Sequence, residues 1–514
     1  MMSGLLVLAC CAGSARAFSL LGPPLAWQTT DLAYMKQYDI GGPMELTAGY
    51  RWNVPVIYYA FDESFIRYFG QQGMKAVDQA MKILNDLPAM TSVTNDGARL
   101  FYKGRPYPMS AVGTPNGQAL AAGLHDVKSH ALMLVLEEMG LAEPQRYSWT
   151  LRARATGTVN NTPVTNYSVR VLNFDPISLR PTNRVNSIYY GYTIQDPVPN
   201  ETYAEAVEQV SLNPDDLYFY SAVADGIVAP GYFFTGLSAD DVGGLRYLYN
   251  RNNVVSEGLS PGVTAPSNLT NIVSSPWLPI SYNTNASNLV AGFIPSAWIP
   301  YLSGTNTGFL NNTNVVVGTN LGLRAIVLAG TTNTATLVTN GLRPGVNHFT
   351  FRKVVYDTLI GQTLEPVTNR FIDQVITNRT LVLQPVERIV SQPDILFVAE
   401  DLGLANDNYT PVLTWRTDTA GWQNNDAING QAVNGGPGVI VPAGGTNTSV
   451  RISFTDQLPY VINRSPVFIT ESPYSAGWGG YWGSFDGTTN APMVYPDYGG
   501  IKIGDLVDKI VTCN

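Results

Sequence analysis

Helical periodicity is confined to the first half of this chain, and this asymmetry constrains the fold more than any other feature. Three stretches have a helical pattern: residues 72–87, 125–140 and 238–249. In the first, apolar residues recur at intervals of three and four along one helix face: Val77, Ala80, Met81, Leu84 and Leu87. The second is apolar on all sides, which predicts a buried helix. Beyond the third, short alternating stretches bounded by Gly, Pro and Asn are typical of strands.

These patterns predict an α+β N-terminal domain followed by a mainly-β, sandwich-like C-terminal region. A chain of 514 residues exceeds what one core usually supports, so we expect two or three domains. A strand over 51–61 precedes the first helix, and a Thr-, Asn- and Val-rich stretch at about 147–216 predicts a β insertion. The later strand candidates are residues 314–318, 348–355, 379–390, 410–415, 450–454 and 467–470.

The expected division of the chain has five parts. They are a signal peptide (1–17), an extended arm rich in Gly, Pro and aromatics (18–50), the α+β domain (51–250), a linker with a small β region (251–345) and a β-sandwich domain (346–514). An apolar run over Leu5–Cys11 and the small residues Ala15 and Ala17 predict secretion, with cleavage before Phe18. The alternative is a buried N-terminal helix. Removal of the leader leaves Cys513 alone, so we expect no intrachain disulfide.

Charge excludes one class of partner. The net charge is −9, and the Lys and Arg residues are scattered, which argues against nucleic-acid binding. Only 13% of residues are charged, so much of the surface must be neutral and copies repel one another weakly. No stretch of about 18 apolar residues follows the leader, so we expect no membrane span.

Three parts of the α+β region resemble the matrixin branch of the metzincin zinc proteases. The strand and helix over residues 51–84 are similar to the opening elements of that catalytic domain. Gly226–Pro230 is similar to the family's Met-turn, with Val228 in place of the methionine. The most specific resemblance is Leu237–Asn250, which is similar to the closing helix. The wider chain also resembles large secreted β-rich proteins of bacteria, a resemblance that implies no particular activity.

The zinc-binding residues that the resemblance implies are missing. A zincin needs H-E-x-x-H on a helix, because two histidines four apart bind one zinc ion and the Glu is the general base. Matching Met139–Leu141 to the family's turn places Met133, Glu137 and Glu143 at the ligand positions and Leu134 at the base. A thioether and two carboxylates make an improbable zinc set, and without a base no water is activated. We therefore expect no catalytic residue, no bound metal and a pseudo-metallopeptidase.

An alignment that takes His130 as the first ligand does no better. It places Ala131 at the base and Leu134 at the second ligand. The only other histidines are His125, which is five residues away and on a different helix face, and His348, in a strand-like stretch. We expect structural or solvent-facing roles for them.

Two further sites are conceivable. Trp478, Tyr481 and Trp482 could stack on sugar rings, although a packed sandwich edge explains them as well. Glu400, Asp401 and Asp407 could hold Ca²⁺, although a solvated loop explains them as well.

The leading hypothesis is a secreted, non-catalytic structural or interaction protein, such as a self-assembling subunit of an extracellular layer or filament, or a component of the cell surface. The arm at 18–50 could add a strand to a neighbour's sheet. One alternative is a secreted hydrolase of metallopeptidase descent with an atypical site at Glu137 and Glu143. Another is an extracellular polysaccharide-binding protein.

Overall fold

A computed structural model describes rather less than three fifths of the chain. The described residues are 17–22, 27–29, 32, 42–47, 49–145, 147–185, 188–195, 205–211, 222–225, 229–260, 262–265, 315–317, 324–327, 337–377, 380–399, 437–439, 449–454 and 481–496. The predicted leader up to residue 16 and the strand candidates 410–415 and 467–470 lie outside them. Strand is the main secondary structure of the described part, so the predicted mainly-β character is confirmed.

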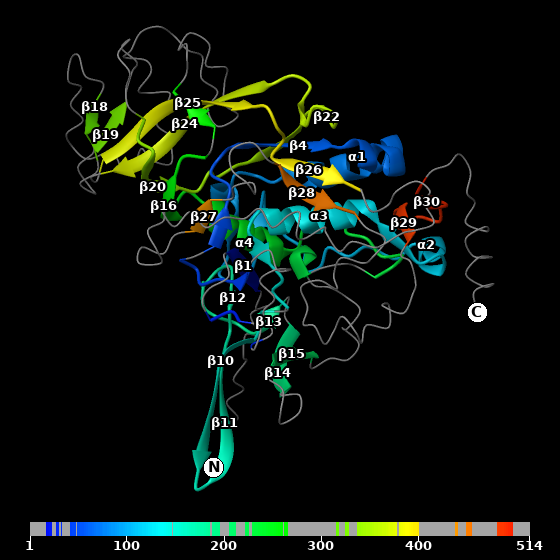
Figure 1. The fold of residues 1–514 in the computed structure, drawn as a ribbon, viewed down its shortest axis with the longest axis vertical. Helices are drawn as coiled ribbons and strands as arrows, with labels where there is room; N and C mark the ends of the chain where they lie inside the picture. The colour runs from blue at the N-terminus through cyan, green and yellow to red at the C-terminus, as the bar shows by residue number, and fades with distance from the viewer. Residues whose placement is uncertain are drawn as a thin grey trace, which may run out of the picture.

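A four-stranded parallel sheet organises the core. β4 (Val56–Phe61) pairs on one side with β21 (Thr350–Lys353) and on the other with β26 (Ile395–Val398), which pairs in turn with β28 (Val450–Ser453). All six residues of β4 are buried, as expected for a strand at the centre of a parallel sheet. The sheet therefore joins residues from both sides of the domain boundary that the sequence suggested near residue 346 (Figure 1).

The predicted strand over 51–61 is two strands. Residues of β3 (Gly49–Arg51) pair with β27 (Pro437–Val439), and β4 begins only at Val56. Pro55 lies in the gap, where it cannot donate a ladder hydrogen bond.

The helix α1 (Glu63–Asn85) packs against this sheet, and α3 (Val127–Glu138) packs against α1. α1 begins nine residues before the expected start, because Asp62 caps it by accepting from Phe65 N at 2.9 Å. Gly70, with φ of 59°, interrupts it and breaks the apolar pattern that the sequence shows. α3 also contacts β9 (Leu141–Ala142) and the short η4 helix (Val223–Asp225). The smaller α2 spans Gly117–Ala121.

The helix α4 (Ala239–Tyr249) begins as the sequence predicts. Ser238 is its N-cap, and Asp241 completes a capping box. Asp241 is also buried, and it accepts hydrogen bonds from Val223 N (3.1 Å) and Ala224 N (3.0 Å). The Asp241 carboxylate therefore holds the η4 segment in place as well as the start of α4.

The N-terminal strand is part of this chain's own core. β1 (Phe18–Gly22) pairs with β2 (Gly42–Pro43), β9 and β12 (Asn173–Phe174), and all five of its residues are buried. The Phe18 ring stacks on Tyr247 with centroids 5.6 Å apart. The expectation of a free arm that adds a strand to a neighbour is therefore wrong for these residues, because their backbone groups are already paired.

The region predicted as a β insertion contains two antiparallel groups. β10 (Thr150–Val159) and β11 (Thr162–Arg170) form a long hairpin. β13 (Arg184–Val185), β14 (Ile188–Gln195) and β15 (Glu205–Ser211) form a three-stranded sheet beside its base. The hairpin projects well beyond the body of the molecule (Figure 1).

A seven-stranded sheet lies on the opposite side of the core (Figure 1). Its strands are β16 (Val254–Gly258), β17 (Val263–Thr264), β18 (Val315–Val317), β19 (Arg324–Val327), β20 (Asn340–Pro344), β24 (Val367–Thr377) and β25 (Thr380–Val390). A buried ion pair between Arg51 Nε and Glu257 Oε1, 2.5 Å apart, ties this sheet to β3. Arg51 also donates to the backbone oxygens of Leu248 and Arg343.

The remaining strands are short. They are β5 (Thr94–Asn95), β6 (Leu100–Tyr102), β7 (Arg105–Pro106), β8 (Leu124–Asp126), β22 (Tyr356–Asp357), β23 (Gln362–Thr363), β29 (Tyr481–Ser484) and β30 (Met493–Val494). β29 pairs in parallel with β8, which brings the distant C-terminal part of the chain against the start of α3. Within the described residues, no helix is long and apolar enough to cross a membrane.

Candidate functional site

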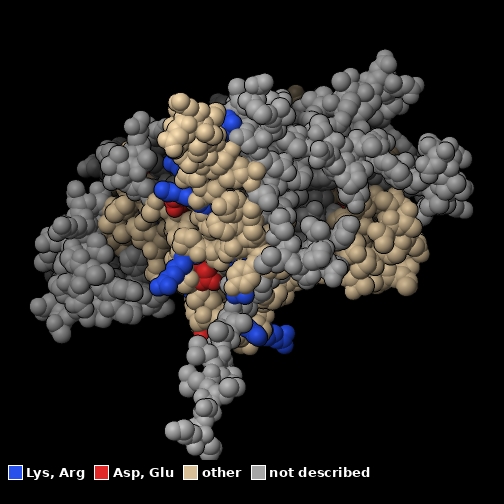
Figure 2. Space-filling model, turned by 90° about the horizontal axis from the view of Figure 1, so that it is seen from below, with Lys and Arg blue, Asp and Glu red and all other residues tan. Residues whose placement is uncertain are grey.

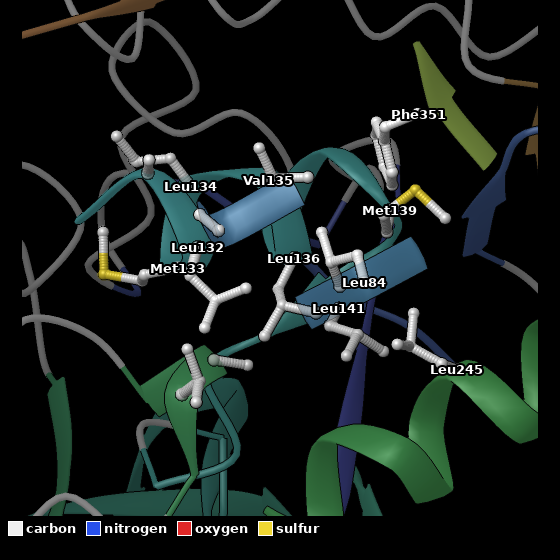
Figure 3. Packing of buried hydrophobic residues seen from close by; sticks show 14 of the residues in the cluster. Leu84, Leu132, Met133, Leu134, Val135, Leu136, Met139, Leu141, Leu245 and Phe351 are labelled. Atoms are coloured by element: carbon white, nitrogen blue, oxygen red, sulfur yellow. The ribbon is translucent and has the colours of Figure 1, made fainter. Parts of the chain in front are cut away.

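The helix α3, where the resemblance places the zinc ligands, is buried on every side. Of its residues, only Lys128 is partly exposed. Its side chains leave the helix in several directions and lie among Leu84 of α1, Leu245 of α4 and Phe351 of β21 (Figure 3). The helix is therefore a central element of the core and has no face open to solvent.

The positions that correspond to the zinc site are filled by packed side chains. Met133, Leu134, Glu137 and Glu143 are between 1% and 3% exposed, and Val228 lies outside the described residues. No group of three or more His, Cys, Asp or Glu within the described residues is placed to hold a metal ion. A peptidase site needs room for a metal-bound water and a substrate chain. Among the described residues, these four positions are closed to solvent.

A cluster of buried polar and aromatic side chains surrounds the start of α3 instead. Asp126 is the N-cap and accepts from Ser129 N (3.0 Å) and Ser129 Oγ (2.5 Å). His130 Nδ1 donates to the Asp126 carbonyl oxygen at 3.0 Å. The His130 ring meets the ring of Trp482 edge-on, with centroids 4.7 Å apart.

His125 belongs to the same cluster. The sequence suggested that it and His130 lie on different faces of one helix, but His125 is in β8, before the helix begins. Its ring therefore folds back to within 5.6 Å of the His130 ring, centroid to centroid. His125 Nδ1 and His130 Nε2 are buried and make no hydrogen bond to any described residue.

Burial sets the charge state of this cluster. Desolvation, assisted by repulsion from His130, lowers the pKa of His125 to about 3. Desolvation also lowers the pKa of His130 to about 4. Both rings are therefore neutral at pH 7, and their burial excludes the solvent-facing role that the sequence left open. Desolvation raises the pKa of the Asp126 carboxyl, and the hydrogen bonds that Ser129 donates to it oppose this rise.

The structure places Trp482 in the core, which removes it as a glycan contact. Its side chain is 2% exposed and packs against Phe454, with centroids 5.1 Å apart, as well as against His130. A sugar ring needs an exposed aromatic face, and Trp482 offers none. Tyr481 contributes backbone pairing in β29, while Trp478 lies outside the described residues.

The other sequence candidates are less informative. His348 is half-buried just before β21, and burial lowers its pKa. The possible Ca²⁺ ligands Glu400, Asp401 and Asp407 lie outside the described residues, as does Cys513.

The β10–β11 hairpin is the candidate interface. Its two strands pair in a sheet of their own, and every residue from 155 to 163 is exposed. Asn160 and Asn161 form the turn with φ of 52° and 64°, the left-handed pair that a type I′ turn requires. Figure 2 views the molecule from the side on which the hairpin projects. On the described part of this face, a few Lys, Arg, Asp and Glu side chains lie among a larger number of other residues.

A second exposed feature is an apolar turn between β22 and β23. Leu359 is 91% exposed, and Ile360 beside it is also exposed. Asp357 Oδ1 accepts from Leu359 N at 2.9 Å, and Gly361 closes the turn with φ of 66°. The turn therefore holds two aliphatic side chains in solvent, a feature associated with contact surfaces.

Comparisons with known proteins find no match: no family model, no curated protein and no solved structure is similar to this chain.

Proposed function

We propose that this chain is a secreted, non-catalytic structural or interaction protein that associates with further copies of itself outside the cell. The observation that carries the proposal is the β10–β11 hairpin, which projects from the body of the molecule with every residue from 155 to 163 exposed among the described residues. Open strand edges are templates for pairing with another chain. The small number of charged residues also keeps repulsion between copies weak.

The non-catalytic part of the proposal is supported by the packing of α3. Glu137 and Glu143, the candidates for an atypical hydrolytic site, are only 3% exposed. We interpret residues 51–250 as a degenerate matrixin-like scaffold in which side chains occupy the volume of the former site. A scaffold can outlast its chemistry, since function depends on the site and not on the fold.

Electron microscopy and sedimentation of the full chain test this proposal. Material collected from the medium of producing cells should show ordered assemblies, and the purified chain should sediment faster as its concentration rises. A matched control replaces residues 155–166 with a short Gly-Ser turn, which removes the projecting part of the hairpin and keeps Tyr167, which packs against the buried cluster of Leu32 and Leu151. The control should remain monomeric. A wild-type chain that is monomeric at every concentration and forms no assemblies would refute the proposal.

A further inference from the structure

Two buried imidazole rings at the start of α3 each carry a nitrogen atom that makes no hydrogen bond to any described residue. These atoms are His125 Nδ1 and His130 Nε2. The side chain of His125 is 3% exposed and that of His130 is 1% exposed. A buried polar atom without a hydrogen bond costs free energy, so its presence in a folded core requires a physical reason. A bound ion and a bound water molecule are two such reasons.

The Nε2 atom of His130 is in the form that binds a metal ion. His130 Nδ1 donates to the Asp126 carbonyl oxygen at 3.0 Å, which leaves Nε2 with a lone pair and no proton. Histidine ligands almost always donate their other ring N–H in this way, because the hydrogen bond fixes the tautomer and the ring orientation. Burial lowers the pKa of His125 to about 3 and that of His130 to about 4, so both rings stay neutral at neutral pH, as metal ligands must be.

The spacing of the two rings suits a single bridging ion. Their centroids are 5.6 Å apart, and the ring planes are perpendicular. Two metal–nitrogen bonds of about 2 Å, with about 1.2 Å from each nitrogen to its ring centre, place the centroids of two opposed imidazoles roughly 6 Å apart. Rotation of a ring about its metal–nitrogen bond changes no bond length, so perpendicular planes are compatible with a bridge. The rings belong to β8 and α3, and the two elements hold them at this spacing.

The number of ligands selects the kind of ion. No third His, Cys, Asp or Glu of the described residues completes a metal-binding group with the two imidazoles. Structural Zn²⁺ is tetrahedral, and Ca²⁺ takes a larger number of oxygen ligands, so neither ion is satisfied by two nitrogens. Imidazole is a good ligand for copper, and Cu(I), like its analogue Ag(I), is stable with two ligands in a line.

A single positive charge also suits the surroundings. Asp126 is the acidic member of this cluster and is buried, and no Lys or Arg of the described part of the chain forms an ion pair with it. Its carboxylate accepts from Ser129 N, which offsets the positive end of the α3 dipole. A monovalent cation balances one buried carboxylate, whereas a divalent ion leaves an excess charge in the core, which is costly.

We propose that His125 Nδ1 and His130 Nε2 bind one Cu(I) ion in a two-coordinate site between β8 and α3. This inference goes beyond the proposed function and does not depend on it. The site is also distinct from the zinc site that the resemblance implied, whose ligand positions are Met133, Glu137 and Glu143.

NMR with Ag(I), which does not change its oxidation state, is the first test. A chain without residues 1–17 and with Cys513→Ser contains no thiol that would compete for the ion. The chain has three histidines, so ¹⁵N labelling of histidine alone gives a simple spectrum. One equivalent of Ag(I) should shift the ring signals of His125 and His130 and leave those of His348 unchanged. Unshifted His125 and His130 signals would overturn the proposal and assign their nitrogens to a buried water molecule.

Cu(I) itself is measured on the same chain without oxygen. X-ray absorption should show two nitrogen neighbours around the bound copper, whereas sulfur neighbours or an absence of binding would overturn the proposal. His125→Phe and His130→Phe should each lose the bound equivalent of Cu(I), and His348→Phe, the matched control, should keep it. Full binding by a folded His130→Phe chain would also overturn the site. The two spectroscopic measurements use the native histidines, so they give a decision even if a Phe variant fails to fold.

Discussion

Restoring the residues of a zinc peptidase should destabilise this chain and should not create an active enzyme. The central change is Leu134→Glu, at the position of the general base, on a helix whose side chains are packed on all sides. Leu134 is 2% exposed, so its removal forfeits about 2 kcal/mol of apolar burial. The new carboxyl must be protonated or unpaired in the core, which costs about 2–4 kcal/mol more. We expect the free energy of unfolding to fall by about 4–6 kcal/mol, a large part of a typical domain's stability.

Urea denaturation followed by circular dichroism measures this loss. Leu134→Met is the matched control, because it conserves volume and should cost less than about 1.5 kcal/mol. The full set, Met133→His, Leu134→Glu, Glu137→His and Glu143→His, should be insoluble or unfolded. A folded quadruple variant that binds one zinc ion per chain and cleaves a protein substrate would refute the reasoning, because it would demonstrate an open site beside α3.

Three further perturbations test the core. The folded chain keeps His130 neutral down to about pH 4, whereas the unfolded chain protonates it near 6.5, so this residue should lower stability by about 1.4 kcal/mol for each unit that the pH falls between those values, and His125 adds a similar slope. His130→Phe should remove its share of the slope in urea titrations and leave that of His125, and an unchanged slope would contradict the assignment. Gly140→Ala should cost about 2–4 kcal/mol in the same assay, because φ is +97° and a Cβ would lie 1.9 Å from Tyr50 O; a variant of wild-type stability would exclude this close approach. Arg51→Met should cost about 3–5 kcal/mol by leaving Glu257 buried without its cation, and adding Glu257→Leu should recover most of the loss; no recovery would show that the ion pair is not the cause.

Local signals predicted the helices well because they depend on neighbouring residues. Ser238 and the acidic residues after it specify the start of α4 without help from the rest of the fold. The expected start of the first helix was wrong because Gly70 interrupts the apolar pattern, while the cap at Asp62 lies beyond that interruption. A search for caps as well as periodicity would have found it.

Pairing between distant segments could not be read from the sequence. The partners of β4 lie about 290 to 340 residues further along the chain, and nothing in an alternating stretch specifies which strand it joins. The burial of Trp482 has the same origin, since β29 reaches the core by pairing with β8. The hairpin was accessible to prediction. Two asparagines between alternating runs, at Asn160 and Asn161, are typical of a type I′ turn.

Sedimentation velocity of the full wild-type chain tests the central claim most directly. Between about 1 µM and about 100 µM, the range in which weak and moderate contacts become populated, we expect the sedimentation coefficient to rise from that of a monomer to that of a dimer or larger assembly. The chain with the Gly-Ser turn in place of residues 155–166 should remain a monomer throughout. A single monomeric species for the wild type across the whole range would contradict the account.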